Sequence, residues 1–151
     1  MPYRNWAGTD TLNAVDVNAM FADPVEADVT GGPEDLSTAS YTDLTTVGPA
    51  VTLTLVSGQA ALVIISAFCN TVSSNAEARI SYAISGGATQ AADDTRAARA
   101  KFASSTIGLR LSFWDVYIAS ATASFTFTMK YKAASGIITG FHDRKIIVKK
   151  F

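Results

Sequence analysis

The sequence predicts an all-β protein, an antiparallel jelly-roll-like β-sandwich of about 7–8 strands preceded by an N-terminal arm with one short helix. From Tyr41 onward, apolar and polar residues alternate with a period of two, and turn residues recur about every ten residues. Before Gly31-Gly32-Pro33, the chain has a single short pattern with helical spacing. We therefore divide the chain into an N-terminal anchoring arm, residues 1–32, and a β-sandwich domain, residues 33–151.

The arm contains a predicted helix over residues 12–21. Asn13 is a favourable N-cap, and Asp16 follows three residues later, as in a capping box. Leu12 and Val17 have the spacing of a hydrophobic staple, and Pro24 ends the pattern. One face of the helix is apolar and consists of Ala14, Val17, Met20 and Phe21.

A helix this short is marginally stable alone in water, so its apolar face needs a surface to pack on. Trp6 adds to that need, because an aromatic side chain buries about 150–250 Å² and each Å² contributes about 25 cal/mol. We expect the arm to dock on a neighbouring subunit or a larger scaffold; the alternative is that it plugs one end of its own sandwich. The predicted partner-binding residues are Tyr3, Trp6, Leu12, Val17, Met20 and Phe21.

The formal net charge of −1 conceals a division of charge along the chain. The first fifty residues hold eight acidic residues against the single base Arg4, whereas the rest hold eleven bases against five acids. This asymmetry suggests that the acidic arm docks on a basic surface, such as the body of a neighbouring copy. The near-neutral total gives no general attraction to nucleic acid or to an anionic membrane.

Eight ranges in the body have strand patterns. In the clearest of them, Phe125, Phe127, Met129 and Tyr131 share one face. Residues 60–69 are apolar on both faces, as in a central strand or one covered by a second layer. A change of phase around Phe113-Trp114 predicts a bulge, and residues 86–100 predict a loop or a short helical turn. The predicted strands are 41–44, 50–56, 60–70, 77–85, 99–104, 108–118, 123–132 and 144–150.

No residues form a recognisable catalytic or metal-binding pattern, so we expect no enzyme, no catalytic residue, no cofactor and no metal. His142 is the only histidine, and its neighbour Asp143 makes an ordinary surface pair. Cys69 is the only cysteine, and its apolar setting predicts a small core residue. The adjacent acids Asp93-Asp94 lack the alternating spacing of calcium ligands. The longest apolar run, residues 60–69, is too short for a membrane-spanning helix, and the start lacks the apolar segment of a secretory signal.

Two binding alternatives remain open at this point. Trp114 and Tyr117 are candidates for a sugar-stacking platform, although aromatics at alternating strand positions are usually core residues. The C-terminal bases Arg144, Lys145, Lys149 and Lys150 are too few, and too poor in neighbouring aromatics, to predict nucleic-acid binding. Pairing with the acidic arm explains these bases with fewer assumptions than binding of nucleic acid does.

Trp6, Gly8 and the run Leu12-Asn13-Ala14-Val15-Asp16-Val17-Asn18, with its L-x-A-x-D-x-N pattern, resemble the opening of many virion structural proteins of tailed bacteriophages. These are minor tail, fibre and capsid decoration proteins, in which a β-rich domain follows. The resemblance covers the arm and the start of the body. It implies a non-enzymatic virion component, often a homotrimer, that is anchored to the particle by its arm and made in the host cytoplasm.

The chain is short for a fibre shaft and has no glycine-rich or heptad segment. A capsid decoration (cement) protein or a small tail-associated protein therefore fits better than a full receptor-binding fibre. The expected partners are copies of the chain, in a trimer, and the major capsid or tail protein, with no nucleic acid and no membrane. The alternatives are a carbohydrate-binding, host-recognition module and a monomeric bacterial sandwich with no assembly role.

Overall fold

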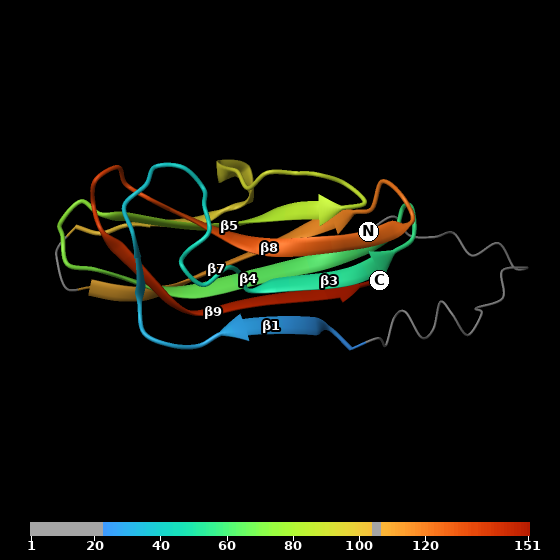
Figure 1. The fold of residues 1–151 in the computed structure, drawn as a ribbon, viewed down its shortest axis with the longest axis horizontal. Coiled ribbons are helices and arrows are strands. Elements are labelled where there is room, and N and C mark those ends of the chain that lie inside the picture. Colours follow the sequence, from blue (N-terminus) through green and yellow to red (C-terminus); the bar gives the residue numbers. More distant parts are fainter. Residues whose placement is uncertain (1–22, 104–106) are drawn as a thin grey trace, which may run out of the picture.

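The computed structural model describes residues 23–103 and 107–151, which form two antiparallel sheets packed face to face (Figure 1). The first sheet has the order β1-β9-β4-β7, and β2 extends its edge by also pairing with β9; the second sheet has the order β3-β8-β5-β6. The first sheet consists of β1 (Val25–Val29), β2 (Glu34–Leu36), β9 (Thr139–Lys150), β4 (Ala60–Thr71) and β7 (Ile107–Ile118). The second sheet consists of β3 (Ala50–Leu55), β8 (Ala123–Ala133), β5 (Glu77–Gly86) and β6 (Ala98–Lys101).

The strand pairing is nested along the chain. Strands β1 and β2 pair with the last strand, β9, as two halves of one edge strand. Moving inward from both ends of the chain, β3 pairs with β8, β4 with β7, and β5 with β6. A long hairpin rolled up in this way, with successive pairs in alternate sheets, is the jelly roll. The predicted fold class is confirmed.

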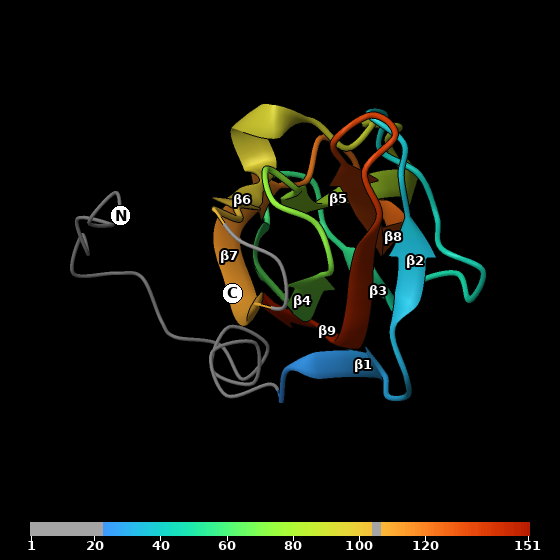
Figure 2. The same ribbon diagram turned by 90° about the vertical axis from the view of Figure 1, so that its left-hand side faces the viewer.

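The end view shows the two sheets as two layers (Figure 2). The core fills the space between them. The predicted inner face of β8 is confirmed, because Phe125, Phe127, Met129 and Tyr131 are fully buried. The inward side chain of Tyr117 meets Phe125 and Phe127 edge-on, with ring centroids 5.5 Å apart in each pair. Alternation with period two therefore sets which side chains enter the core.

The predicted strand ranges match β3 to β9 except at their ends, and β9 begins earlier than predicted, at Thr139. The predicted strand 41–44 is wrong, because only an isolated bridge joins Thr42 to Tyr131 there. Strands β1 and β2 were not predicted. β1 lies within the segment predicted as the arm, so the sandwich already begins at Val25.

The predicted bulge at Phe113-Trp114 is also wrong. The β4–β7 register is continuous from Ala60 opposite Ile118 to Thr71 opposite Ile107. The irregularity lies between β4 and β9, where Ser66 pairs with Lys145 and Phe68 with His142, so β9 has the extra residue. The phase change in β7 arises because its outer face also carries apolar side chains.

The predicted arm helix lies in residues 1–22, outside the residues that the structure describes. Within the described part, the helical element is a single 3-10 turn, η1 (Asp94–Arg96), inside the predicted loop 86–100. No described helix is long and apolar enough to cross a membrane.

Three acidic residues of the first fifty pair with bases of the body within the same protomer. Glu26 contacts Lys145 at 2.8 Å, Glu34 contacts Arg144 at 2.6 Å, and Asp43 contacts Lys130 at 2.7 Å. These pairs arise because β1, β2 and the following loop lie beside β9 and β8. The charge asymmetry therefore gives no independent support for docking on a neighbour.

Candidate interaction surface

The outer face of β7 exposes large apolar side chains. The strand alternates regularly, so the odd-numbered residues from Leu109 to Tyr117 point inward and the even-numbered residues from Arg110 to Ile118 point outward. Three of the outward residues are apolar: Trp114 is 68% exposed, Val116 46% and Ile118 56%. A tryptophan with two thirds of its surface in water is unusual, because its burial contributes more than that of most side chains.

The neighbouring strands continue this surface. Ile64 on β4 lies opposite Trp114 on one side and opposite Ile147 of β9 on the other. Leu62 of β4 lies opposite Val116. The side chains of Leu62, Ile64 and Ile147 are half-buried. Directly opposite residues point to the same face of a sheet, so these side chains are in contact range. We call this group the outer apolar patch; its members are Leu62, Ile64, Trp114, Val116, Ile118 and Ile147.

The spacing of strands and residues sets the size of the patch. It spans β9, β4 and β7, which is about 10 Å across, because adjacent strands lie about 4.8 Å apart. From Trp114 to Ile118 it extends about 13 Å along β7, at about 3.4 Å per residue. A surface of this size accommodates two to three turns of an α-helix.

Polar residues border the patch. Lys149 lies opposite Leu62 on the outer face. Toward the bulge, Ser66 lies opposite Ser112, and the Arg110 guanidinium donates to the Ser66 hydroxyl at 3.3 Å. An apolar centre with a polar rim is the usual composition of a protein–protein contact.

The outer face of the second sheet is polar. Cross-strand hydroxyl pairs join Thr52 to Thr126 at 2.7 Å and Thr54 to Ser124 at 3.2 Å. Farther along β8, Lys130 bonds to both carboxylate oxygens of Asp43 at 2.7 Å. Hydroxyl and charged groups of this kind are solvated or paired on the surface, so this face needs no further cover.

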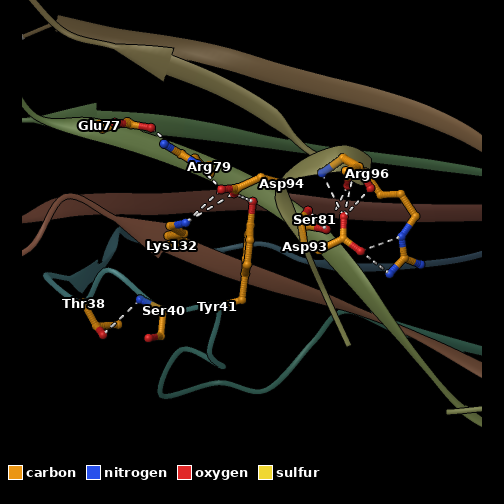
Figure 3. Close-up of polar contacts among 11 residues, drawn as sticks. Thr38, Ser40, Tyr41, Glu77, Arg79, Ser81, Asp93, Asp94, Arg96 and Lys132 are labelled. Atoms are coloured by element: carbon orange, nitrogen blue, oxygen red, sulfur yellow. Dashed lines mark hydrogen bonds and ion pairs between the residues drawn. The ribbon is translucent and has the colours of Figure 1, made fainter. Parts of the chain in front are cut away.

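Asp94 organises a cluster on that polar face (Figure 3). Its carboxylate contacts Arg79 at 2.5 Å and Lys132 at 3.1 Å, and accepts a hydrogen bond from the Tyr41 hydroxyl at 2.9 Å. The hydrogen bond from Arg79 contributes most to holding the pKa of Asp94 far below its ordinary value. The cluster ties the start of η1 to β5, β8 and the 37–49 loop.

Asp93 is the N-cap of η1, and its carboxylate accepts from the backbone N–H groups of Thr95 and Arg96. A hydrogen bond from the Thr95 hydroxyl, followed by those from Arg96, lowers its pKa to about 2. Both acids of the Asp93-Asp94 pair are thus used in local structure. Across residues 23–103 and 107–151, no group of three or more metal-ligating side chains occurs.

His142 and Cys69 point to opposite faces of the first sheet. The His142 ring packs against Phe68 on the outer face, with centroids 4.7 Å apart, and lies 3.2 Å from the Asp143 carboxylate. Cys69 is fully buried, and burial raises the pKa of its thiol to about 12. A protonated, enclosed thiol has little nucleophilic reactivity.

Trp114 and Tyr117 also lie on opposite faces of β7. Trp114 points outward, whereas Tyr117 packs in the core. Three residues of separation in a strand reverse the side-chain direction. Tyr117 is therefore a core residue, and Trp114 is the one of the two candidates that could stack on a sugar.

The C-terminal bases do not form one surface either. Arg144 is 1% exposed, and its guanidinium donates to Glu34 at 2.6 Å and to the carbonyls of Thr46 and Gly48. Burial raises the pKa of Glu34, but hydrogen bonds from the Thr46 backbone and the charge of Arg144 outweigh it and lower the pKa below its ordinary value. Arg144 is thus a core residue that fastens β2 and the 37–49 loop to β9.

The predicted partner-binding residues Tyr3, Trp6, Leu12, Val17, Met20 and Phe21 all lie in residues 1–22, outside the described part of the chain. The outer apolar patch is not predicted from the sequence. Two signals of it were present: apolar residues on both faces of residues 60–69, and the phase change at Phe113-Trp114. Each indicates a strand that carries apolar side chains on its outer face.

No protein-family model matches the chain, and no curated protein matches it. Its fold is similar to that of a chain in the structure of infectious bursal disease virus, Gx strain, with a TM-score of 0.50 and 11% sequence identity. The similar region covers 83% of this chain but only 32%, about a third, of the viral one. The two chains thus share a sandwich fold.

Proposed function

We propose that this chain is a non-enzymatic structural protein of a bacteriophage particle, either a capsid decoration (cement) protein or a small tail-associated protein. It is made in the host cytoplasm and binds neighbouring virion subunits through its N-terminal arm. The observation that carries the proposal is a jelly roll that leaves an apolar patch, centred on Trp114, on the outside of one sheet.

The fold supports a virion role. Jelly rolls are a recurrent architecture of viral capsid domains, although lectins and cupins also have them. The similarity to a chain of a virus structure agrees with the first of these uses. The resemblance of the arm, from Trp6 to Asn18, to tailed-phage virion proteins adds the phage assignment and the trimer.

The patch supports an assembly role. Monomeric soluble proteins rarely expose contiguous apolar surface, and such surface usually marks a contact with a partner. Here the patch combines a tryptophan with branched aliphatic side chains, and residues of these types lie at the centre of protein–protein contacts. Most homo-oligomers are closed and symmetric, so copies around a three-fold axis are a natural arrangement.

The polar groups support a non-enzymatic role. Asp93, Asp94 and Glu34 are each held in structural ion pairs with bases of the same protomer. A catalytic group instead needs a partner that leaves it available to a substrate.

The test is the mass of the purified full chain by light scattering, with and without Trp6→Ala. We expect a trimer for the parent and a lower mass at equal concentration for the variant, with unchanged thermal stability of the sandwich. A truncation should remove residues 1–22 and not 1–32, because β1 begins at Val25. A parent that is monomeric at all concentrations, or that is absent from purified particles by mass spectrometry, contradicts the proposal.

A second candidate function is carbohydrate binding for host recognition, favoured by the exposure of Trp114. A sugar ring stacked on the indole would change its fluorescence. Titration with a glycan panel, using Trp114→Ala as the control, separates the two functions. Saturable quenching that this substitution abolishes would favour the carbohydrate-binding function.

A further inference from the structure

We propose that the outer apolar patch of each copy receives the predicted helix, residues 12–21, of a second copy. The inference rests on the proposed function and deepens it by naming the surface that accepts the arm. Two apolar groups of the chain each need a partner surface. One is the patch on β9, β4 and β7; the other is the helix face predicted from the sequence.

The two surfaces agree in size. The apolar helix face, from Ala14 to Phe21, is about 10 Å long at 1.5 Å per residue. The patch measures about 10 Å by 13 Å, as the strand geometry requires. One helix laid along β4 and β7 therefore covers Leu62, Ile64, Trp114 and Val116 together. Ile118 and Ile147 then lie at the edges of the covered area.

The position where the arm leaves the sandwich brings it near the patch. Val25, the first residue of β1, lies opposite Val148, near the C-terminal end of β9 (Figures 1 and 2). At that end, Ala60 lies opposite Ile118, and the Phe151 N–H donates to the Ala60 carbonyl at 2.9 Å. The start of β1, which the arm precedes in the chain, and the exposed Ile118 end of the patch therefore lie at the same end of the sheet.

The link residues favour a second copy over the arm's own sheet. Pro24 directly precedes β1, and the residue before a proline, Asp23, is restricted to extended conformations. An extended Asp23-Pro24 continues the line of β1 past the end of the sheet instead of turning back over β4 and β7. Residues 12–21 are then carried toward the adjacent molecule. Contact of one arm with the next patch is heterologous and closes into a ring, as a trimer requires.

Charge is complementary as well. The arm has Asp10, Asp16 and Asp23 along the predicted helix and its flanks. The patch is bordered by Lys149, which forms no ion pair with any of the described residues. Pairing of Asp16 or a flanking acid with Lys149 would fix the orientation of the helix on the patch more than it would add affinity.

The first experiment uses Trp114 as the reporter in the full chain with Trp6→Phe, which leaves Trp114 as the single tryptophan. We expect acrylamide quenching of Trp114 to fall several-fold as protein concentration rises, in step with the increase in mass. Adding Phe21→Asp should restore strong quenching at every concentration. Protection that is independent of concentration would mean that the chain's own arm covers the patch, and no protection would mean that nothing does; either result overturns the proposal.

The second experiment uses mixing. Val116→Asp breaks the patch and Phe21→Asp breaks the arm, so each variant alone should lose self-association. A mixture should recover a complex of one copy of each, because one intact arm still meets one intact patch. Val72→Asp is the matched control: Val72 is 70% exposed beyond the end of β4 and away from the patch, so this variant should associate like the parent.

The outcomes separate the two proposals. If Phe21→Asp abolishes association but Val116→Asp does not, the arm acts as proposed and the receiving surface is elsewhere. If neither substitution changes the mass, arm-mediated assembly itself fails. Thermal unfolding of each variant checks that the sandwich is intact. For a variant that fails this check, Val116→Thr, which keeps the branched side chain, replaces Val116→Asp.

Discussion

The outer faces of the two sheets differ although both belong to one alternating jelly roll. The second sheet presents threonine and serine hydroxyls in cross-strand pairs and a charged cluster around Asp94. The first sheet presents Trp114, Val116 and Ile118 to solvent. Both inner faces are mainly apolar, so the packing of the core does not explain this difference. We propose that it marks the outer face of the first sheet as a contact surface.

Ion pairs also differ between the two sheets. The first sheet has a pair with a fully buried base, Glu34 with Arg144, which joins its edge strand β2 to β9. Over the second sheet, Asp94 and Asp43 pair with bases while remaining half-exposed, and the buried base there is Arg96, paired with Asp93. A buried guanidinium without its partner is far more costly than a broken surface pair.

Glu34→Gln should have the largest effect on stability. It leaves the buried Arg144 guanidinium without a negative partner, and we expect a loss of about 3 kcal/mol in the free energy of unfolding. Denaturant unfolding measures this loss. Glu26→Gln is the matched control on the same sheet, because the Glu26–Lys145 pair is exposed and should contribute less than about 0.5 kcal/mol. Equal losses in both variants would contradict the distinction between buried and exposed pairs.

Val116→Thr should separate association from folding. The substitution keeps the β-branched shape at an exposed position, so the stability of the monomer should change by less than about 0.5 kcal/mol. Association should weaken by about tenfold, which corresponds to about 1.4 kcal/mol. Sedimentation equilibrium measures the association constant. An unchanged constant would show that the patch is ordinary solvent-exposed surface.

Asp94→Asn should have a smaller effect, about 0.5–1 kcal/mol, because its partners Arg79 and Lys132 are near the surface. Salt should reduce the difference between parent and variant, since the charges are screened. Denaturant unfolding at low and high salt measures both. A loss as large as that of Glu34→Gln would place Asp94 among the buried, essential ion pairs.

Acid should weaken the same loop. The pKa of Asp93 is lowered to about 2 in the folded protein, from an ordinary value of 3.8. Its contribution is therefore complete above about pH 4 and is lost as the pH falls toward 2. Asp93→Asn should remove this part of the pH dependence and leave the rest. Unfolding of the parent and variant between pH 2 and 5 tests the prediction; parallel curves would contradict it.

The double substitution Thr52→Val with Thr126→Val should have the smallest effect on stability. Removing both partners of a hydrogen bond at once leaves no unsatisfied group, so the change should be near zero. The new valines place apolar side chains on the polar sheet. If exposed apolar side chains alone were sufficient for association, this variant would associate more strongly than the parent. Light scattering measures the mass of both proteins.

Much of the fold follows from the sequence because alternation with period two determines which side chains enter the core. Phe125 to Tyr131 on β8 is the clearest case. Alternation does not reveal which strands pair, and the jelly roll is predicted from the number of strands together with the N-terminal arm. The edge strand β1 was missed although Val25-Glu26-Ala27-Asp28-Val29 alternates. Its acids were interpreted as part of an acidic arm, whereas Glu26 pairs with Lys145 on the next strand.

The candidate surface was harder to predict, because an apolar residue looks the same whether it enters the core or faces outward. Trp114 was considered as a binding residue, but it was grouped with Tyr117, which lies inside. The phase change at Phe113-Trp114 was interpreted as a bulge in the backbone. Only the continuous register of β7 against β4 shows that the strand is regular and that the apolar residues lie on both of its faces.

The most direct test of the central claim is hydroxyl-radical footprinting of the unmodified full chain at two protein concentrations, below and above self-association. We expect oxidation of Trp114 to fall several-fold at the higher concentration, while the exposed Val72 is oxidised equally at both. Equal oxidation of Trp114 at both concentrations, in a chain shown to be assembled at the higher one, would contradict the claim that the outer face of the first sheet is a subunit contact.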